Sequence, residues 1–358
     1  MNQLANDCDR KSSRYQLEIV WRNVFLMTSL HLAAIYGLFL MTFYAKYATL
    51  LMHNLSVIIL GLGITCGAHR LWAHRSYEAS LGLRIFLMLL NSSSLQNDIY
   101  VWSRDHRTHH KFSETDADPH NVCRGFFFSH IGWLLCRKHP DVRQFGQTIS
   151  MSDLEEDIVI QFQRKFYRPL SILMTFIVPT VLAWFCWNED FFIALLTTMT
   201  RYTFTLHATW LVNSAAHLYG RQPYDCRMRP SDNLFVEYIS IGEGYHNYHH
   251  VFPQDYSASE LSWTMDYNFS TLFIDLCAWF GLVWNRKKIE PKMIAERVRR
   301  TGDPSLIQVY HSRKNYSLWL HTIIPTVLMI ILPILTVFLF RRFLSRFCTT
   351  YFDENFSR

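Results

Sequence analysis

The chain has 358 residues, of which 50% are hydrophobic and 16% aromatic, and its formal net charge is +6. Its mean hydropathy of +0.02 is too high for a typical charged soluble domain. We attribute the positive charge to loops at a membrane surface, and therefore expect membrane lipid but no nucleic acid as a partner.

Two long apolar runs come first, at about 24–45 and about 48–68. Each has roughly twenty residues, enough for a helix that crosses a hydrocarbon core of about 30 Å. Because the gap between them is very short, we predict a helical hairpin. The next apolar run, Leu81 to Leu90, is short and carries Arg84, so we expect it in the membrane interface or in a cap outside the membrane.

A second hairpin is predicted at about 170–187 and about 191–212, with 188–190 as the turn. Arg201 interrupts the later run and is expected to face the bundle or the cap, because a charge at mid-membrane costs about 2.5–3.5 kcal/mol. A further apolar run at about 318–340 is a candidate fifth span. Basic residues flank this run on both sides and leave its orientation open.

Basic residues indicate how the two hairpins are oriented. Residues 69–168 contain 13 Lys and Arg and residues 213–300 contain 10, whereas the two short turns share only Lys46. By the positive-inside rule, both polar blocks face the cytosol. We therefore predict an all-α integral membrane protein with a four-helix transmembrane stem and a cytosolic helical cap. Its segments are a cytosolic N-terminal segment 1–22, a main domain 23–302 with cap regions 69–169 and 213–302, and a C-terminal extension 303–358.

Histidine is concentrated in the predicted cap. Eight of the 17 histidines fall in three short runs, and a further histidine, with an asparagine one turn before it, ends the fourth predicted span. These residues are His69, His74, His106, His109, His110, His246, His249 and His250 in the runs, and Asn213 and His217 in the span. In two of the runs the spacing is i, i+3 and i+4, which brings side chains to one face of a helix.

Nine neutral imidazoles are too many for one metal ion, but they divide over two ions with coordination numbers of five and four. Imidazole binds iron, copper, zinc and nickel, so the ligands alone leave the metal open. A position at the membrane surface, where a lipid tail can enter, favours iron, because oxidation of an unactivated acyl chain requires O₂ and a redox metal. The cap is thus predicted to hold a di-iron centre.

Three strings around these histidines, at 67–77, 105–115 and 209–217, resemble those of the animal membrane-bound acyl-CoA Δ9 (stearoyl-CoA-type) desaturases, and the resemblance extends over roughly 20–302. It implies an O₂-dependent enzyme of the endoplasmic reticulum membrane that introduces a cis double bond into a saturated fatty acyl-CoA at a site facing the cytosol. It also implies electrons from an NADH-dependent reductase through cytochrome b5, as a separate protein because we find no fused haem domain.

The resemblance further implies roles for individual residues. One iron would be bound by His69, His74, His106, His110 and His249, and the other by His109, His217, His246 and His250, with Asn213 acting through a water. The CoA end and the acyl entrance would contact Asn23, Asn97, Arg104, Asp105, Arg137, Lys138 and Trp210. Val57 and Gly61 would lie near the end of an acyl tunnel. We expect Gly61 to leave the tunnel open there, so that chains at least as long as stearoyl are accepted.

Other interpretations are open at this point. The same scaffold could carry a desaturase or hydroxylase of different regioselectivity. A membrane metal transporter would also be rich in histidine, although along a pathway inside its spans. A lipid-binding relative without activity would be expected to lack some of the histidines, and none is missing. Outside the runs, His31, His53 and His207 are expected to serve helix packing. The run 286–288 indicates topology or lipid attraction, or contact with an acidic electron donor.

Overall fold

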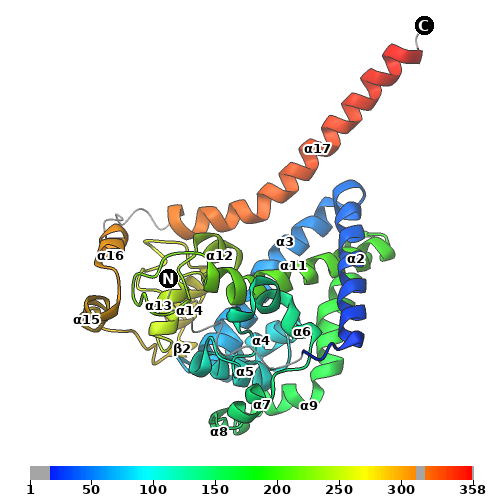
Figure 1. Ribbon diagram of the computed structural model, residues 1–358. Coiled ribbons are helices and arrows are strands. Elements are labelled where there is room, and N and C mark those ends of the chain that lie inside the picture. Colours follow the sequence, from blue (N-terminus) through cyan, green and yellow to red (C-terminus); the bar gives the residue numbers. More distant parts are fainter. Residues whose placement is uncertain (1–16, 312–318, 357–358) are drawn as a thin grey trace.

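The computed structural model describes residues 17–311 and 319–356, and nearly all of its regular structure is helical (Figure 1). The predicted all-α membrane architecture is confirmed. Two short strands, β1 (Glu78–Ala79) and β2 (Val283–Trp284), pair antiparallel. The predicted segment 1–22 lies mostly outside the described residues, as does the start of the C-terminal apolar run at Leu318.

Four helical stretches among the described residues are long and apolar enough to cross a membrane. They are α2 (Trp21–Phe43); α3 (Tyr47–Leu62) continued by the π-helix η1 (Gly63–Ala73); α9 (Ile158–Ile172), η4 (Leu173–Ile177) and α10 (Val178–Trp187) in one line; and His321–Arg346 within η5 (Trp319–Ile323) and α17 (Ile324–Phe356). The second and third predicted spans are therefore parts of longer helices. The second continues through His69, and the third begins earlier than predicted, at Ile158.

The fourth predicted span lies in α11 (Phe191–Leu218), which is long enough to cross a membrane but is not among the four most apolar helices. It packs along α2, and the side of α11 that faces the protein carries buried threonines and Arg201. Arg201 donates a hydrogen bond from Nη2 to the carbonyl of Thr175 at 2.7 Å, which agrees with its predicted inward orientation. These polar residues lower the hydropathy of α11, and neighbouring helices shield them.

The turns of the two hairpins lie side by side. Asn188 ends α10 in the left-handed conformation, and Asp190 caps the first turn of α11. Between them, Glu189 accepts hydrogen bonds from the backbone N–H of Lys46 at 2.7 Å and from the Thr49 hydroxyl. Lys46 Nζ donates to the carbonyls of Trp187 and Asn188. These contacts bring both predicted turns to the same end of the bundle, which leaves the histidine runs at the other end.

Short helices form the cap at that other end. They are α4 (Leu81–Ser92), α5 (Ile99–Phe112), η2 (Val122–Arg124), η3 (Phe128–Gly132), α6 (Trp133–Leu135), α7 (Pro140–Gly146), α8 (Ser152–Glu155), α12 (Leu234–Ile239), α13 (His246–Val251), α14 (Phe269–Trp279), α15 (Pro291–Thr301) and α16 (Pro304–His311). The main core lies where α4 and α14 pack against α3 and η1. Helix α4 is amphipathic, since Leu83 and Leu87 are buried in this core while Leu81 and Phe86 are exposed.

Helix α17 leaves the rest of the molecule at an angle (Figure 1). Its first half lies along α3, where Asn54 Nδ2 donates to the carbonyl of Ile330 at 3.0 Å. Further along, the Arg341 guanidinium donates to the carbonyls at the end of α2 and in the turn after it, those of Met41, Thr42 and Ala45. The helix continues through Pro333 without breaking. The candidate fifth span is therefore a long helix that reaches the hairpin turns.

Candidate metal centre

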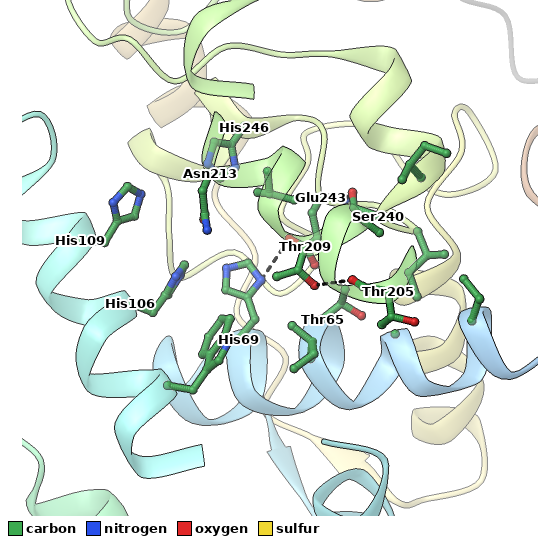
Figure 2. A pocket seen from close by; sticks show the side chains of 18 residues that line it. Thr65, His69, His106, His109, Thr205, Thr209, Asn213, Ser240, Glu243 and His246 are labelled. Carbon is green, nitrogen blue, oxygen red and sulfur yellow. Dashed lines mark hydrogen bonds and ion pairs between the residues drawn. The ribbon is translucent and has the colours of Figure 1, made fainter. Parts of the chain in front are cut away.

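The nine histidines come from four segments, namely η1 with the residue after it, α5, α11 and α13. Figure 2 shows four of them, His69, His106, His109 and His246, beside Asn213. His69 lies on η1 and His74 directly follows it, three histidines lie on α5, His217 lies in the last turn of α11, and three lie on α13. Their ring nitrogens form two groups, and within each group the nitrogens lie within 4.8 Å of one another. One group is His69, His74, His106, His110 and His249, and the other is His109, His217, His246 and His250.

Helical spacing explains why each HxxHH run contributes to both groups. On α5, His106 and His110 are four residues apart and enter the first group, while His109 enters the second. On α13 the assignment is reversed, since His246 and His250 enter the second group and His249 the first. All three side chains lie on one side of the helix, but at 3.6 residues per turn i+4 lies about 40° to one side of residue i and i+3 about 60° to the other. Two such helices facing each other thus build two adjacent groups.

The distances between nitrogens suit bound metal ions. Nε2 of His69 lies 2.9 Å from Nε2 of His249, and Nε2 of His74 lies 2.8 Å from Nε2 of His106. In the second group, Nε2 of His246 lies 2.9 Å from that of His217. Two nitrogens bound to one metal at about 2.0–2.1 Å and at a right angle lie about 2.9 Å apart. The converging Nε2 atoms therefore match neighbouring ligands of one ion.

Two carboxylates orient one histidine in each group. Glu243 Oε2 lies 3.0 Å from Nδ1 of His69, and Asp118 Oδ1 lies 2.8 Å from Nδ1 of His109. A carboxylate on Nδ1 holds the proton there, so Nε2 presents its lone pair to a metal. Glu243 is also bonded by Arg70, at 2.9 Å. Burial alone would raise the pKa of the Glu243 carboxyl, but Arg70 and His69 beside it lower this pKa below its usual value.

The other carboxylate is ionised for a similar reason. Burial alone would raise the pKa of Asp118, but His109 and His120 lower it. Burial and neighbouring imidazoles also lower the pKa values of the histidines themselves, well below the ordinary value for His74, His106 and His249 and to about 3 for His246. These imidazoles are therefore neutral at physiological pH, and a neutral ring is the form that binds a metal.

Three connected spaces lead past the two groups. A charged basin at the surface is lined by Glu18, Arg104, Asp105, Arg137, Lys138 and Arg143. A middle pocket shares Asp105 with the basin and is also lined by Asn97, His120, Trp133 and Trp210. An apolar tunnel shares Trp102, His106, Thr209 and Asn213 with the middle pocket and is also lined by Val57 and Gly61.

Asn213 lies where the tunnel passes the two groups, close to His106, His109 and His246 (Figure 2).

Most of the predicted substrate-contacting residues line these spaces. Asp105 forms ion pairs with Arg104, at 3.1 Å, and with Lys138. Arg137 pairs with Glu18 at 2.8 Å. Asn23 is placed differently, because its side chain donates to the carbonyl of Leu134 at 2.8 Å and it is not among the residues that line the three spaces.

The space beside Gly61 is smaller than we expected from a glycine at this position. A Cβ atom built on Gly61 would lie 2.9 Å from Cδ1 of Ile241. The room that Gly61 leaves is therefore taken by the Ile241 side chain, and Gly61 allows this close approach. Val57 and Gly61 both line the tunnel.

Sequence reasoning missed the two carboxylates, and it did not place His120 or Trp133 in the site, although both line the middle pocket. Asp118 follows His109 by nine residues and Glu243 precedes His246 by three, so proximity to the runs was an available signal. His120 forms a further group with His109 and Asp118, overlapping the second group through His109. Burial lowers the pKa of the His120 ring to about 4.

The histidines within the spans are bonded elsewhere. Nε2 of His31 lies 3.1 Å from Nε2 of His207, whose Nδ1 lies 2.9 Å from Nε2 of His130. His53 Nε2 contacts the Thr197 hydroxyl at 3.1 Å. These contacts agree with the predicted packing role and lie outside the two groups.

The chain is similar in sequence to known proteins over most of its length. A family profile described as "Fatty acid desaturase" matches residues 47–267. The stearoyl-CoA desaturase of Sus scrofa is 53% identical over 301 residues, which cover 83% of this chain and 82% of the relative. That of Homo sapiens is 52% identical over 299 residues, with 82% of each chain covered. An acyl-CoA Delta-9 desaturase of Acheta domesticus is 53% identical over 302 residues, with 84% of each chain covered. The chain therefore belongs to the fatty acid desaturase family of oxidoreductases, and within it to the animal stearoyl-CoA-type group.

Proposed function

We propose that this protein is an O₂-dependent desaturase that introduces a cis double bond, at the Δ9 position, into a saturated fatty acyl-CoA. The observation that carries the proposal is the passage of an apolar tunnel directly along two groups of imidazoles. The charged basin and the apolar tunnel suit a substrate with a phosphorylated head and a long tail. The relatives named above are acyl-CoA or stearoyl-CoA desaturases, which supports the same substrate class.

The nine histidines would hold two iron ions, with the five-nitrogen group binding one and the four-nitrogen group the other. Asn213 would hold a water beside the second. Bound iron supplies the activation of O₂ that removal of hydrogen from an unactivated methylene requires. Glu243 and Asp118 keep the protons of their histidines on Nδ1.

The remaining residues bind and align the substrate. Arg104, Arg137 and Lys138 at the basin attract the CoA phosphates, and their paired carboxylates hold these side chains in place before substrate arrives. Trp210 lines the route inward. The tunnel excludes water from the methylenes beside the histidines, and its length beyond the metals is set near Val57 and Gly61.

The overall reaction balances with an external reductant. Two hydrogen atoms from adjacent methylenes, two protons and two electrons reduce one O₂ to two waters, and a carbon–carbon double bond remains. We assign the electrons to cytochrome b5 and its NADH-dependent reductase. The proposed location is the endoplasmic reticulum membrane with the cap in the cytosol, as supported by the excess of Lys and Arg in the cap regions.

Expression in a yeast strain that lacks its own Δ9 desaturase tests the function. We expect growth without added unsaturated fatty acid and new Δ9 products by mass spectrometry. A hydroxylated product would favour the hydroxylase, and a double bond elsewhere a different regioselectivity. Good expression without any new lipid product would contradict the proposal.

The metal assignment has its own test. The purified protein should contain about two irons per chain, and His109→Ala should abolish turnover while leaving membrane insertion intact. Turnover retained by His109→Ala, or iron content unaffected by loss of several of the nine histidines, would contradict the assignment.

A further inference from the structure

Two ring nitrogens in the middle pocket lack hydrogen-bond partners. Among the described residues, Nε1 of Trp133 and Nδ1 of His120 are both buried and bonded to nothing. Both residues line the middle pocket. A buried donor without a partner costs roughly 1–3 kcal/mol, and native proteins contain few of them. Two such nitrogens on residues that line the same pocket therefore indicate a polar ligand that bonds them when it is present.

The position of His120 is fixed without any bond to its ring. Its backbone N–H donates to Asp118 Oδ1 at 2.9 Å, the same oxygen that holds His109. Its ring packs edge-on against Trp133, with ring centroids 4.4 Å apart at 90°. His120 is not one of the nine histidines of the two groups. The side chain is thus held in place, with its polar atoms left for another molecule.

The place of this pair along the route identifies what it would meet. The middle pocket that His120 and Trp133 line shares Asp105 with the basin. Trp102 and His106 mark the opposite end, where the tunnel begins. In an acyl-CoA whose phosphates are in the basin and whose chain is in the tunnel, the segment between them is the pantetheine arm. That arm carries amide groups, which both donate and accept hydrogen bonds.

We propose that Trp133 and His120 bind the amide groups of the pantetheine arm. Trp133 Nε1 donates to an amide carbonyl, and the His120 ring bonds an amide through Nδ1. The pair positions the substrate, because anchoring the arm fixes how far the acyl chain reaches along the metal groups. This inference rests on the proposed function, since it requires CoA as the substrate's carrier.

The test compares two ligands on the full-length, iron-loaded protein in detergent. One is CoA itself, and the other is 3′-phospho-ADP, which carries the CoA phosphates but lacks the pantetheine arm. Trp133→Phe and His120→Phe should each weaken CoA binding about fivefold, the loss expected for one hydrogen bond, and leave 3′-phospho-ADP binding unchanged. His120→Gln, which retains an N–H, should recover most of the loss. Trp184→Phe, at an exposed tryptophan of α10, is the matched control and should change neither ligand.

Steady-state kinetics gives a second readout. Both Phe variants should raise KM for acyl-CoA and produce double bonds at more than one position, with unchanged iron content. Unchanged CoA binding in both variants would overturn the inference, as would equal losses for the two ligands or a loss of iron from His120→Phe. If the wild-type protein binds no CoA and desaturates no acyl-CoA, the proposed function itself fails, which separates the two outcomes.

Discussion

At the scale of single residues, each proposed iron site has one histidine whose Nδ1 contacts a carboxylate. Glu243 holds His69 in the five-nitrogen group, and Asp118 holds His109 in the four-nitrogen group. The groups beside these carboxyls lower their pKa values, so each carboxylate places a negative charge against one ring of the ligand set. They fix both the tautomer and the orientation of a ring.

Asp118→Asn should therefore weaken the four-nitrogen site specifically. An asparagine can no longer hold the proton on Nδ1 of His109 as a carboxylate does, and loss of such a partner typically costs about 10–100-fold in metal affinity or activity. Iron content and turnover measure the effect. Asp116→Asn is the matched control, because Asp116 pairs with Arg124 and not with a histidine. Equal iron content and activity in both variants would show that Asp118 does not orient a ligand.

A single residue, Gly61, is also expected to set the space for the acyl tail. Gly61→Trp should displace Ile241, which already lies against this glycine, and shorten the space for the acyl tail. We expect the preferred substrate to shift toward shorter chains, as measured by product analysis across acyl-CoA lengths. Gly82→Ala, where an added Cβ would meet no atom within 4 Å, is the control. Products unchanged across chain lengths in Gly61→Trp would show that the tunnel does not end there.

At the scale of elements, sequence spacing explains the cap better than the stem. The HxxHH runs predicted helices, and α5 and α13 are those helices. Hydropathy located α2 and α3, but it was less informative for α11. The buried Arg201 and threonines of α11 lower its hydropathy, and only neighbouring helices reveal that these residues are shielded. The partners Asp118 and Glu243 could not be assigned from sequence, because loop conformation decides which nearby acid reaches a histidine.

Helix α17 offers an element-scale prediction. Arg341 bonds three carbonyls at the end of α2 and in the following turn, and helix C-termini have unpaired carbonyls that favour a cation. Arg341→Ala should lower the free energy of unfolding by about 1.5–3 kcal/mol, the range for hydrogen bonds to a charged group. Thermal unfolding in detergent measures it, with Arg342→Ala at an exposed neighbour as the control. Equal melting temperatures for the two variants would contradict a docked α17.

At the scale of the whole molecule, Arg341 of α17 contacts the first hairpin turn, at the end of the bundle opposite the cap. If the cap is cytosolic, the C-terminal end of α17 lies in the lumen. A glycosylation acceptor tag fused after α17 should therefore be modified, whereas the same tag inserted between α15 and α16 should stay unmodified. Glycosylation of the cap tag alone would reject this topology. So would the absence of glycosylation at both tags, provided that each tag is shown to be accessible.

The continuity of α3 and η1 has a consequence for the bilayer. The stretch Tyr47–Ala73 has 27 residues and is about 40 Å long, whereas a hydrocarbon core is about 30 Å thick. The excess carries His69 out of the membrane on the same rigid rod that spans it. A thinner or thicker bilayer tilts such a rod, and the tilt would shift an imidazole relative to its eight neighbours. The geometry of the metal centre would in this way depend on bilayer thickness, a property that the unsaturated lipids made by such an enzyme themselves change.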